Sequence, residues 1–216
     1  MEFPKSTEFN KRISKQRFYD NLSVTSELKQ LFVQQILTIY WRNKIAPSTV
    51  NIEAGKEVVE IEIFQLKLNQ QNLDLKVLEL IDKGIPYHIL FLLEYNGLFQ
   101  ACIGYKEIDN TQSNSFKMHN YYQTNWLTIE QLNLQIEGLN TDSVYTNFIR
   151  QIAGEYLSIK TSENIKEAII RDEKQKKLLK QIGKIEAKIN KEPQFNRQIK
   201  LNEELKKLKK ELKGLQ

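Results

Sequence analysis

The sequence contains little of what most enzymes use for chemistry. Its 216 residues include one cysteine and two histidines, so the chain cannot form an internal disulfide or a cysteine-rich zinc site. The eight glycines are scattered and form no phosphate-binding pattern such as GxGxxG. We therefore expect no metal, no cofactor and a protein that is not an enzyme.

Long apolar runs are also missing. The longest, "IPYHILFLLEY", falls well short of the roughly 20 residues that span a bilayer. The first residues, "MEFPKSTEFNKRI", contain no apolar stretch that could serve as a signal peptide. These two absences predict a cytoplasmic protein without a membrane partner.

What the chain does have is a globular composition and an uneven charge. Hydrophobic residues make up 40% of the chain, enough for a packed core. Residues 161–216 carry 16 Lys or Arg against 9 Asp or Glu, whereas residues 1–160 carry 16 against 18. The net charge of +5 therefore arises in the tail. This split predicts two modules, a body over 1–160 and a tail over 161–216.

The first half of the body predicts helices and strands in alternation. After the cap candidate Thr25, apolar spacing predicts a helix over about 26–43. Residues 48–68 predict a hairpin that turns at Ala54-Gly55, and a second helix follows and ends at Gly84.

The second half predicts a buried central strand over 85–95, because this run is apolar on both faces. Asn96-Gly97 predicts a tight hairpin to the next strand. Beyond a polar loop at 109–115, strands are expected over 116–126 and 130–136, and a helix before Gly154. The body is thus predicted to be an α+β (mixed α/β) domain with a mixed sheet of five or six strands.

The tail predicts an antiparallel helical hairpin, a short coiled coil with its apex near Pro193. Apolar residues at heptad spacing precede this proline and follow it: Leu178, Ile182, Ile185, Ile189, Leu201, Leu205, Leu208, Leu212 and Leu215. Folding at the apex places Leu178 opposite Leu208 and Ile182 opposite Leu205, but Leu212 and Leu215 opposite Gln175 and Arg171.

The last two leucines consequently need another cover, such as the body, a second copy or a different protein; a frayed chain end is the alternative. The residues predicted to bind a partner are Leu178, Ile182, Leu205, Leu208, Leu212 and Leu215.

Two further groups could carry function in the body. A basic stripe, Lys11, Arg12, Lys15 and Arg17, alternates with aromatic residues and could contact nucleic-acid phosphates. Alternatively, it belongs to a capping segment whose rings pack on the sheet. Glu60 and Glu62 share a strand face and could hold Mg²⁺ in a nuclease-like core, yet Lys67 is wrongly spaced for that motif. A solvent-facing charged edge is the favoured interpretation of these glutamates.

Several stretches together resemble a bacterial family called domain of unknown function 4391. They are "PKSTEFNKRI", "IAPSTVNI", "ELIDKGIPYHILFLLEYNG", "ACIGYKE", "VYTNFIRQIAG" and "FNRQIKLNEELKKLKKEL". The resemblance covers essentially the whole chain. It implies a gene encoded beside DNA methyltransferases and helicase-type proteins of restriction or phage-defence clusters, and it implies no catalytic residues.

Two functional hypotheses follow. The first is a non-enzymatic accessory or adaptor subunit that binds a helicase or methyltransferase subunit, or a second copy of itself, through the hairpin. The second is a nucleic-acid-binding protein that uses the basic hairpin and the N-terminal stripe, with or without a degenerate or metal-dependent nuclease-like core.

Overall fold

The computed structural model describes residues 3–20, 24–108, 116–154, 157, 159 and 163–215. The chain separates into two compact units, Met1–Tyr156 and Leu157–Gln216. The boundary predicted between residues 160 and 161 lies outside the described residues, as does the predicted polar loop at 109–115.

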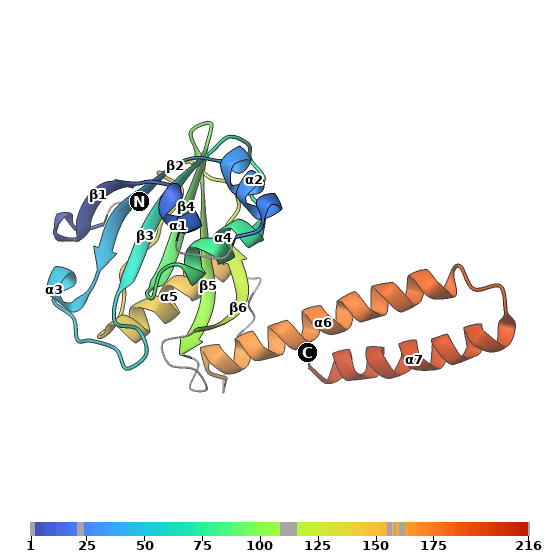
Figure 1. Ribbon diagram of the computed structural model, residues 1–216. Coiled ribbons are helices and arrows are strands. Elements are labelled where there is room, and N and C mark those ends of the chain that lie inside the picture. The colour runs from blue at the N-terminus through green and yellow to red at the C-terminus, as the bar shows by residue number, and fades with distance from the viewer. Residues whose placement is uncertain are drawn as a thin grey trace. The chain divides into compact units, whose positions relative to one another are not determined.

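The first unit is built on a six-stranded mixed sheet whose strands lie in chain order (Figure 1). Its strands are β1 (Glu8–Ile13), β2 (Ile36–Ile45), β3 (Ile61–Leu68), β4 (His88–Tyr95), β5 (Leu98–Ile108) and β6 (Phe116–Gln123). Strands β3 and β4 pair in parallel, and the other neighbours pair antiparallel. The α+β prediction with a mixed sheet is confirmed.

Helices cover the sheet on both faces. The unit contains a 3₁₀ turn (Lys5–Thr7), α1 (Gln16–Asp20), α2 (Ser26–Gln35), α3 (Pro47–Val50), α4 (Leu75–Lys83) and α5 (Thr141–Ala153). Phe64 and Phe91 share one core with Phe32 of α2 and Val77 of α4. Because side chains alternate along a strand, the intervening residues face the opposite side, where α5 packs on β5.

The central strands match the predictions. Five consecutive residues of β4, Ile89–Leu93, are at most 4% exposed, as expected for a strand covered on both faces. Asn96 and Gly97 join β4 to β5 with φ values of 48° and 79°, the left-handed conformations that a tight hairpin requires.

The predicted helix over 26–43 is wrong in its second half. Helix α2 begins after Thr25, whose hydroxyl accepts a hydrogen bond from the Leu28 N–H at 3.2 Å, but it ends at Gln35. Ile36 then pairs with Leu68 of β3. The β-branched residues that follow suit a strand, and pairing along β3 overrides the local helical spacing.

Two other strand predictions are also wrong. The antiparallel partner of β3 is β2 rather than residues 48–52, because Pro47 begins the one-turn helix α3. Residues 130–136 form no strand, although Leu132 and Leu134 are 2% and 4% exposed. The alternating apolar residues of this segment reflect the burial of two leucines in a stretch that pairs with no strand.

Strand β1 forms one edge of the sheet and is irregular. Its register with β2 shifts between Glu8 and Lys11, and Asn10 adopts a φ of 48°. The bulge twists this edge and sets the direction of the basic residues that follow it.

The loop before β3 is held by the start of α5. The Asp142 carboxylate accepts hydrogen bonds from the N–H groups of Lys56, Glu57 and Val58 at 2.7, 3.1 and 2.7 Å. A Cβ at Gly55 would lie 2.2 Å from that carboxylate, so only glycine allows this approach.

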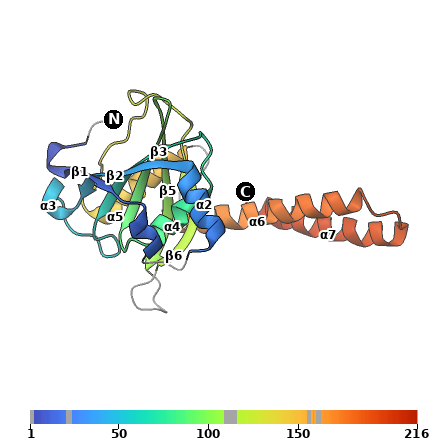
Figure 2. The ribbon, with the colours of Figure 1, turned by 45° about the horizontal axis from the view of Figure 1, so that its top comes forward.

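The second unit contains helices α6 (Ile165–Ile189) and α7 (Phe195–Gly214), which lie side by side in both views (Figures 1 and 2). Ion pairs join Lys174 to Glu211 at 3.0 Å and Lys209 to Glu186 at 2.8 Å. The predicted helical hairpin is confirmed. Among the described helices, none combines the length and apolar character that a bilayer span requires.

Candidate functional site

Two buried glutamates lie at the start of strand β3, Glu60 just before it and Glu62 within it, which corrects the prediction of a solvent-facing edge. Glu60 is 8% exposed and Glu62 is 1% exposed, because β3 lies in the interior of the sheet between β2 and β4. Glu60 forms an ion pair of 2.5 Å with Lys44 of β2. No ion pair of Glu62 is present among the described residues.

Neither carboxylate oxygen of Glu62, nor the indole N–H of Trp41, has a hydrogen-bond partner among the residues that the structure describes. Burial, and after it the neighbouring Glu60 carboxyl, raise the pKa of Glu62 to about 8, against the opposing effects of Lys44 and Trp41, which do not reach hydrogen-bonding geometry. The group is therefore mostly protonated at neutral pH, when it offers one donor and one acceptor.

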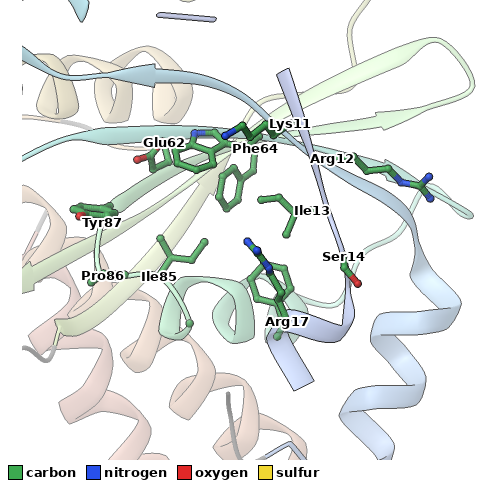
Figure 3. Close-up of a pocket in the computed structure, with 13 residues that line it drawn as sticks. Lys11, Arg12, Ile13, Ser14, Arg17, Glu62, Phe64, Ile85, Pro86 and Tyr87 are labelled. Atoms are coloured by element: carbon green, nitrogen blue, oxygen red, sulfur yellow. The ribbon is translucent and has the colours of Figure 1, made fainter. Parts of the chain in front are cut away.

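Glu62 lies in the wall of a cavity of about 650 Å³. In Figure 3, Glu62 and Phe64 extend from the sheet, and Ile85 and Pro86 lie across the cavity on the segment after α4. Arg17 points toward Phe64 from α1. This space is in the size range of small-ligand sites.

Three of the four predicted nucleic-acid contacts line this cavity: Lys11, Arg12 and Arg17. Strand β1 and helix α1 bring them there from positions that are separated in the sequence by a turn. Figure 3 shows the Arg12 side chain directed away from Arg17. Lys15 instead donates a hydrogen bond to the Ile36 carbonyl, and burial lowers its pKa.

Aromatic rings form much of the remaining wall. Trp41, Phe64, Phe18 and Tyr87 line the cavity, and Tyr87 is 37% exposed. The ring of Phe9 lies 4.0 Å from that of Trp41 between centroids, and the Lys11 ammonium lies 4.4 Å over the Phe9 ring. The ring of Phe9 thus packs on the sheet, as the capping-segment interpretation expects, and three of the cations line a cavity. Contact with nucleic acid stays a prediction.

The chemistry that this arrangement provides is binding. Rings offer stacking surfaces, cations at the rim suit an anionic group, and a buried carboxyl offers a paired donor and acceptor. Among the described residues, no group of three or more His, Cys, Asp or Glu could hold a metal ion. Lys67 points to the other face of β3 and pairs with Glu94 at 3.3 Å.

A second buried polar cluster is fully satisfied. Lys106 of β5 lies 3.2 Å from Asp82 of α4, and the Tyr121 hydroxyl donates to the other oxygen of Asp82. Burial raises the pKa of Asp82 and lowers that of Lys106. His88 lies 3.2 Å from the Lys106 carbonyl, and burial lowers its pKa to about 4, as expected for a core histidine.

Cys102 is 0% exposed, and burial raises the pKa of its thiol, so it behaves as a small core residue.

On comparison with known proteins, the model of one family matches residues 1–212, and its description is Domain of unknown function (DUF4391). The chain belongs to this family. The match covers both units and nearly the whole length, so the helical hairpin is part of what DUF4391 describes. No curated protein and no solved structure matches the chain. DUF4391 therefore supplies a family but no site residues, and the cavity must be interpreted from its own geometry.

The sequence patterns did not predict that Trp41 and residues 84–87 line a cavity. Trp41 lay inside the predicted helix, where its pairing with Phe64 could not be foreseen. The available signal was Glu62 itself, a charged residue within the otherwise apolar run "IEIF".

Proposed function

We propose that this protein is a non-enzymatic accessory subunit of a bacterial restriction or phage-defence system, and that its hairpin binds a partner protein. The observation that carries the proposal is the incomplete burial of α7. None of its residues is buried, although Leu201, Leu205, Leu208, Leu212 and Leu215 are only half-buried at heptad spacing. On α6, by contrast, Leu178, Ile182 and Ile185 are buried.

The exposed parts of the hairpin favour an acidic, amphipathic helix as the occupant. Phe195 and Ile199 are 73% and 43% exposed, and their i, i+4 spacing places them on one side of α7. Helix α7 carries seven Lys or Arg and three Glu, so a second copy would bring like charges together. The Gln175 side chain donates a hydrogen bond to the Leu215 carbonyl at 2.9 Å and fixes the end of α7. The predicted fold at Pro193 had instead placed Arg171 opposite Leu215.

The test is the native mass of the particle formed when the chain is co-expressed with the products of its neighbouring genes. We expect a stable hetero-particle that is lost in the double variant Leu205→Glu, Leu212→Glu, since a leucine that the partner buries contributes about 2 kcal/mol. Charge reversal at Lys206 and Lys213 should weaken the hetero-particle without altering the hairpin. The matched control, charge reversal at Lys76 and Lys83 of the body, should leave the hetero-particle unchanged.

Circular dichroism checks that α7 remains helical in each variant. A wild-type chain that keeps its monomer mass beside these products would contradict the proposal. A homodimer mass would equally contradict it, because the occupant would then be a second copy.

A second function is favoured by the convergence of cations and rings at the cavity of the first unit. We propose that β1 and α1 bind nucleic acid, with Lys11 and Arg17 contacting phosphates and the rings contacting bases. Charge reversal at both residues should weaken binding of single-stranded DNA and reduce the slope of log K against log salt by about 2. The exposed Lys76→Glu is the control, and equal slopes in all three proteins would contradict this function.

A further inference from the structure

The cavity beside Glu62 combines three features that one class of ligand would satisfy together. Its buried carboxyl has no hydrogen-bond partner among the described residues, its walls are aromatic, and its rim is cationic. An unpaired polar group at 1% exposure costs free energy that the fold does not recover from its own residues. Buried groups without partners in a cavity are typical of binding sites.

We propose that this cavity binds a single nucleobase, with the Glu62 carboxyl hydrogen-bonded to the edge of the base and the attached phosphate held by Lys11 and Arg17. The proposal deepens the second function above and rests on it. The Watson–Crick edge of every nucleobase presents a donor next to an acceptor, and a protonated carboxyl group can pair with both. The indole N–H of Trp41, for which the described part of the chain offers no hydrogen-bond partner either, supplies a further donor in the cavity wall.

The geometry explains why a nucleotide fits better than an anion without a flat ring. Phe64 and Ile85 face the space from opposite sides, so a flat ring can lie between them and exclude water (Figure 3). A volume of about 650 Å³ holds one nucleotide. Lys11 lies on β1, two strands away from Glu62 on β3. Lys11 pairs with Trp41 of the intervening strand β2, and Trp41 pairs with Phe64 of β3. The cation and the carboxyl therefore come from strands that β2 separates, and a nucleotide likewise holds its phosphate apart from the edge of its base.

The ligand could be a free nucleotide or one residue of a single strand. The shared chemistry is a nucleobase joined to a phosphate through a sugar. The test therefore compares the four ribonucleoside monophosphates with single-stranded 12-mers of each base, and with a 12-mer of abasic spacers that carries the same backbone charge. Affinities are measured by fluorescence anisotropy at low salt with the full chain, and the monophosphates compete with a labelled 12-mer.

We expect base-bearing 12-mers to bind at least 10-fold more tightly than the abasic 12-mer. Glu62→Leu should bring that ratio close to 1 while leaving abasic binding unchanged, and Lys76→Ala should alter neither. Because leucine removes an unpaired buried carboxyl, the variant should be at least as stable as the wild type, so a loss of affinity cannot be attributed to unfolding. A thermal melt confirms this point.

The possible results separate the two proposals. Equal affinity of the wild type for abasic and base-bearing strands overturns the nucleobase site. If charge reversal at Lys11 and Arg17 still weakens the binding of both strands, nucleic-acid binding itself is supported. No binding of any strand or monophosphate overturns both. Displacement of the 12-mer by monophosphates at micromolar concentration identifies a free nucleotide as the ligand, and its absence identifies a strand.

Discussion

Replacing Asp82 with alanine is expected to lower the free energy of unfolding by about 3–5 kcal/mol, because it leaves the Lys106 ammonium buried without a counter-charge. The side chains of the two residues are 2% and 1% exposed, so water cannot replace the lost carboxylate. The Tyr121 hydroxyl loses its acceptor in the same change. Urea denaturation monitored by circular dichroism measures the effect.

The matched control removes both charges at once. Asp82→Leu combined with Lys106→Met should be close to the wild type in stability, or more stable, because no buried charge remains unpaired. If the single and the double variants lost the same stability, the ion pair would not be the cause, and packing between α4 and β5 would be the explanation instead.

Replacing Glu62 with leucine is expected to change the dependence of stability on pH. The pKa of this carboxyl rises from 4.5 to about 8 on folding, so the folded chain holds a proton that the unfolded chain releases. Its contribution is complete below pH 4.5, falls as the pH rises from there to about 8, and stays lost above that value.

Between pH 4.5 and pH 8 the free energy of unfolding of the wild type should therefore fall by about 3 kcal/mol through this one group. This value is smaller than the full pKa shift would give, because the Glu60 and Glu62 carboxyls titrate together. In Glu62→Leu that slope should disappear, and the variant should exceed the wild type in stability at pH 9. Thermal melts from pH 4 to pH 9 measure both quantities, with the exposed Glu53→Gln as control. A Glu62→Leu profile that follows the wild type throughout would show that the carboxyl is solvated.

Sequence patterns predicted the parts of the fold that depend on neighbours along the chain. The Asn96-Gly97 hairpin, the helix that ends at Gly84 and the heptads around Pro193 each carry a local signal, and each is present. The end of α2 could not be predicted in the same way, since Ile36 joins a strand only because Leu68 is available 32 positions later. Long-range pairing has no local pattern.

The candidate site likewise combines residues that the sequence patterns identified with an arrangement that they did not predict. The cationic character of Lys11, Arg12 and Arg17 was evident from the sequence, but their meeting with Trp41 and Glu62 depends on the order of β1, β2 and β3 in the sheet. Glu62 was expected at a solvated edge because alternating glutamates usually mark one. Its burial follows from β4 and β1 extending the sheet on both sides of the β2–β3 pair, which no short stretch encodes.

The irregular β1 edge also protects the protein from aggregation. An exposed edge strand presents unpaired N–H and C=O groups that could recruit a strand of another molecule into a growing sheet. The left-handed Asn10 interrupts the spacing that such recruitment needs, and Lys11 and Arg12 would bring their charges against the incoming chain. The residues that give the cavity its charge thereby also make the edge a poor template for intermolecular sheets.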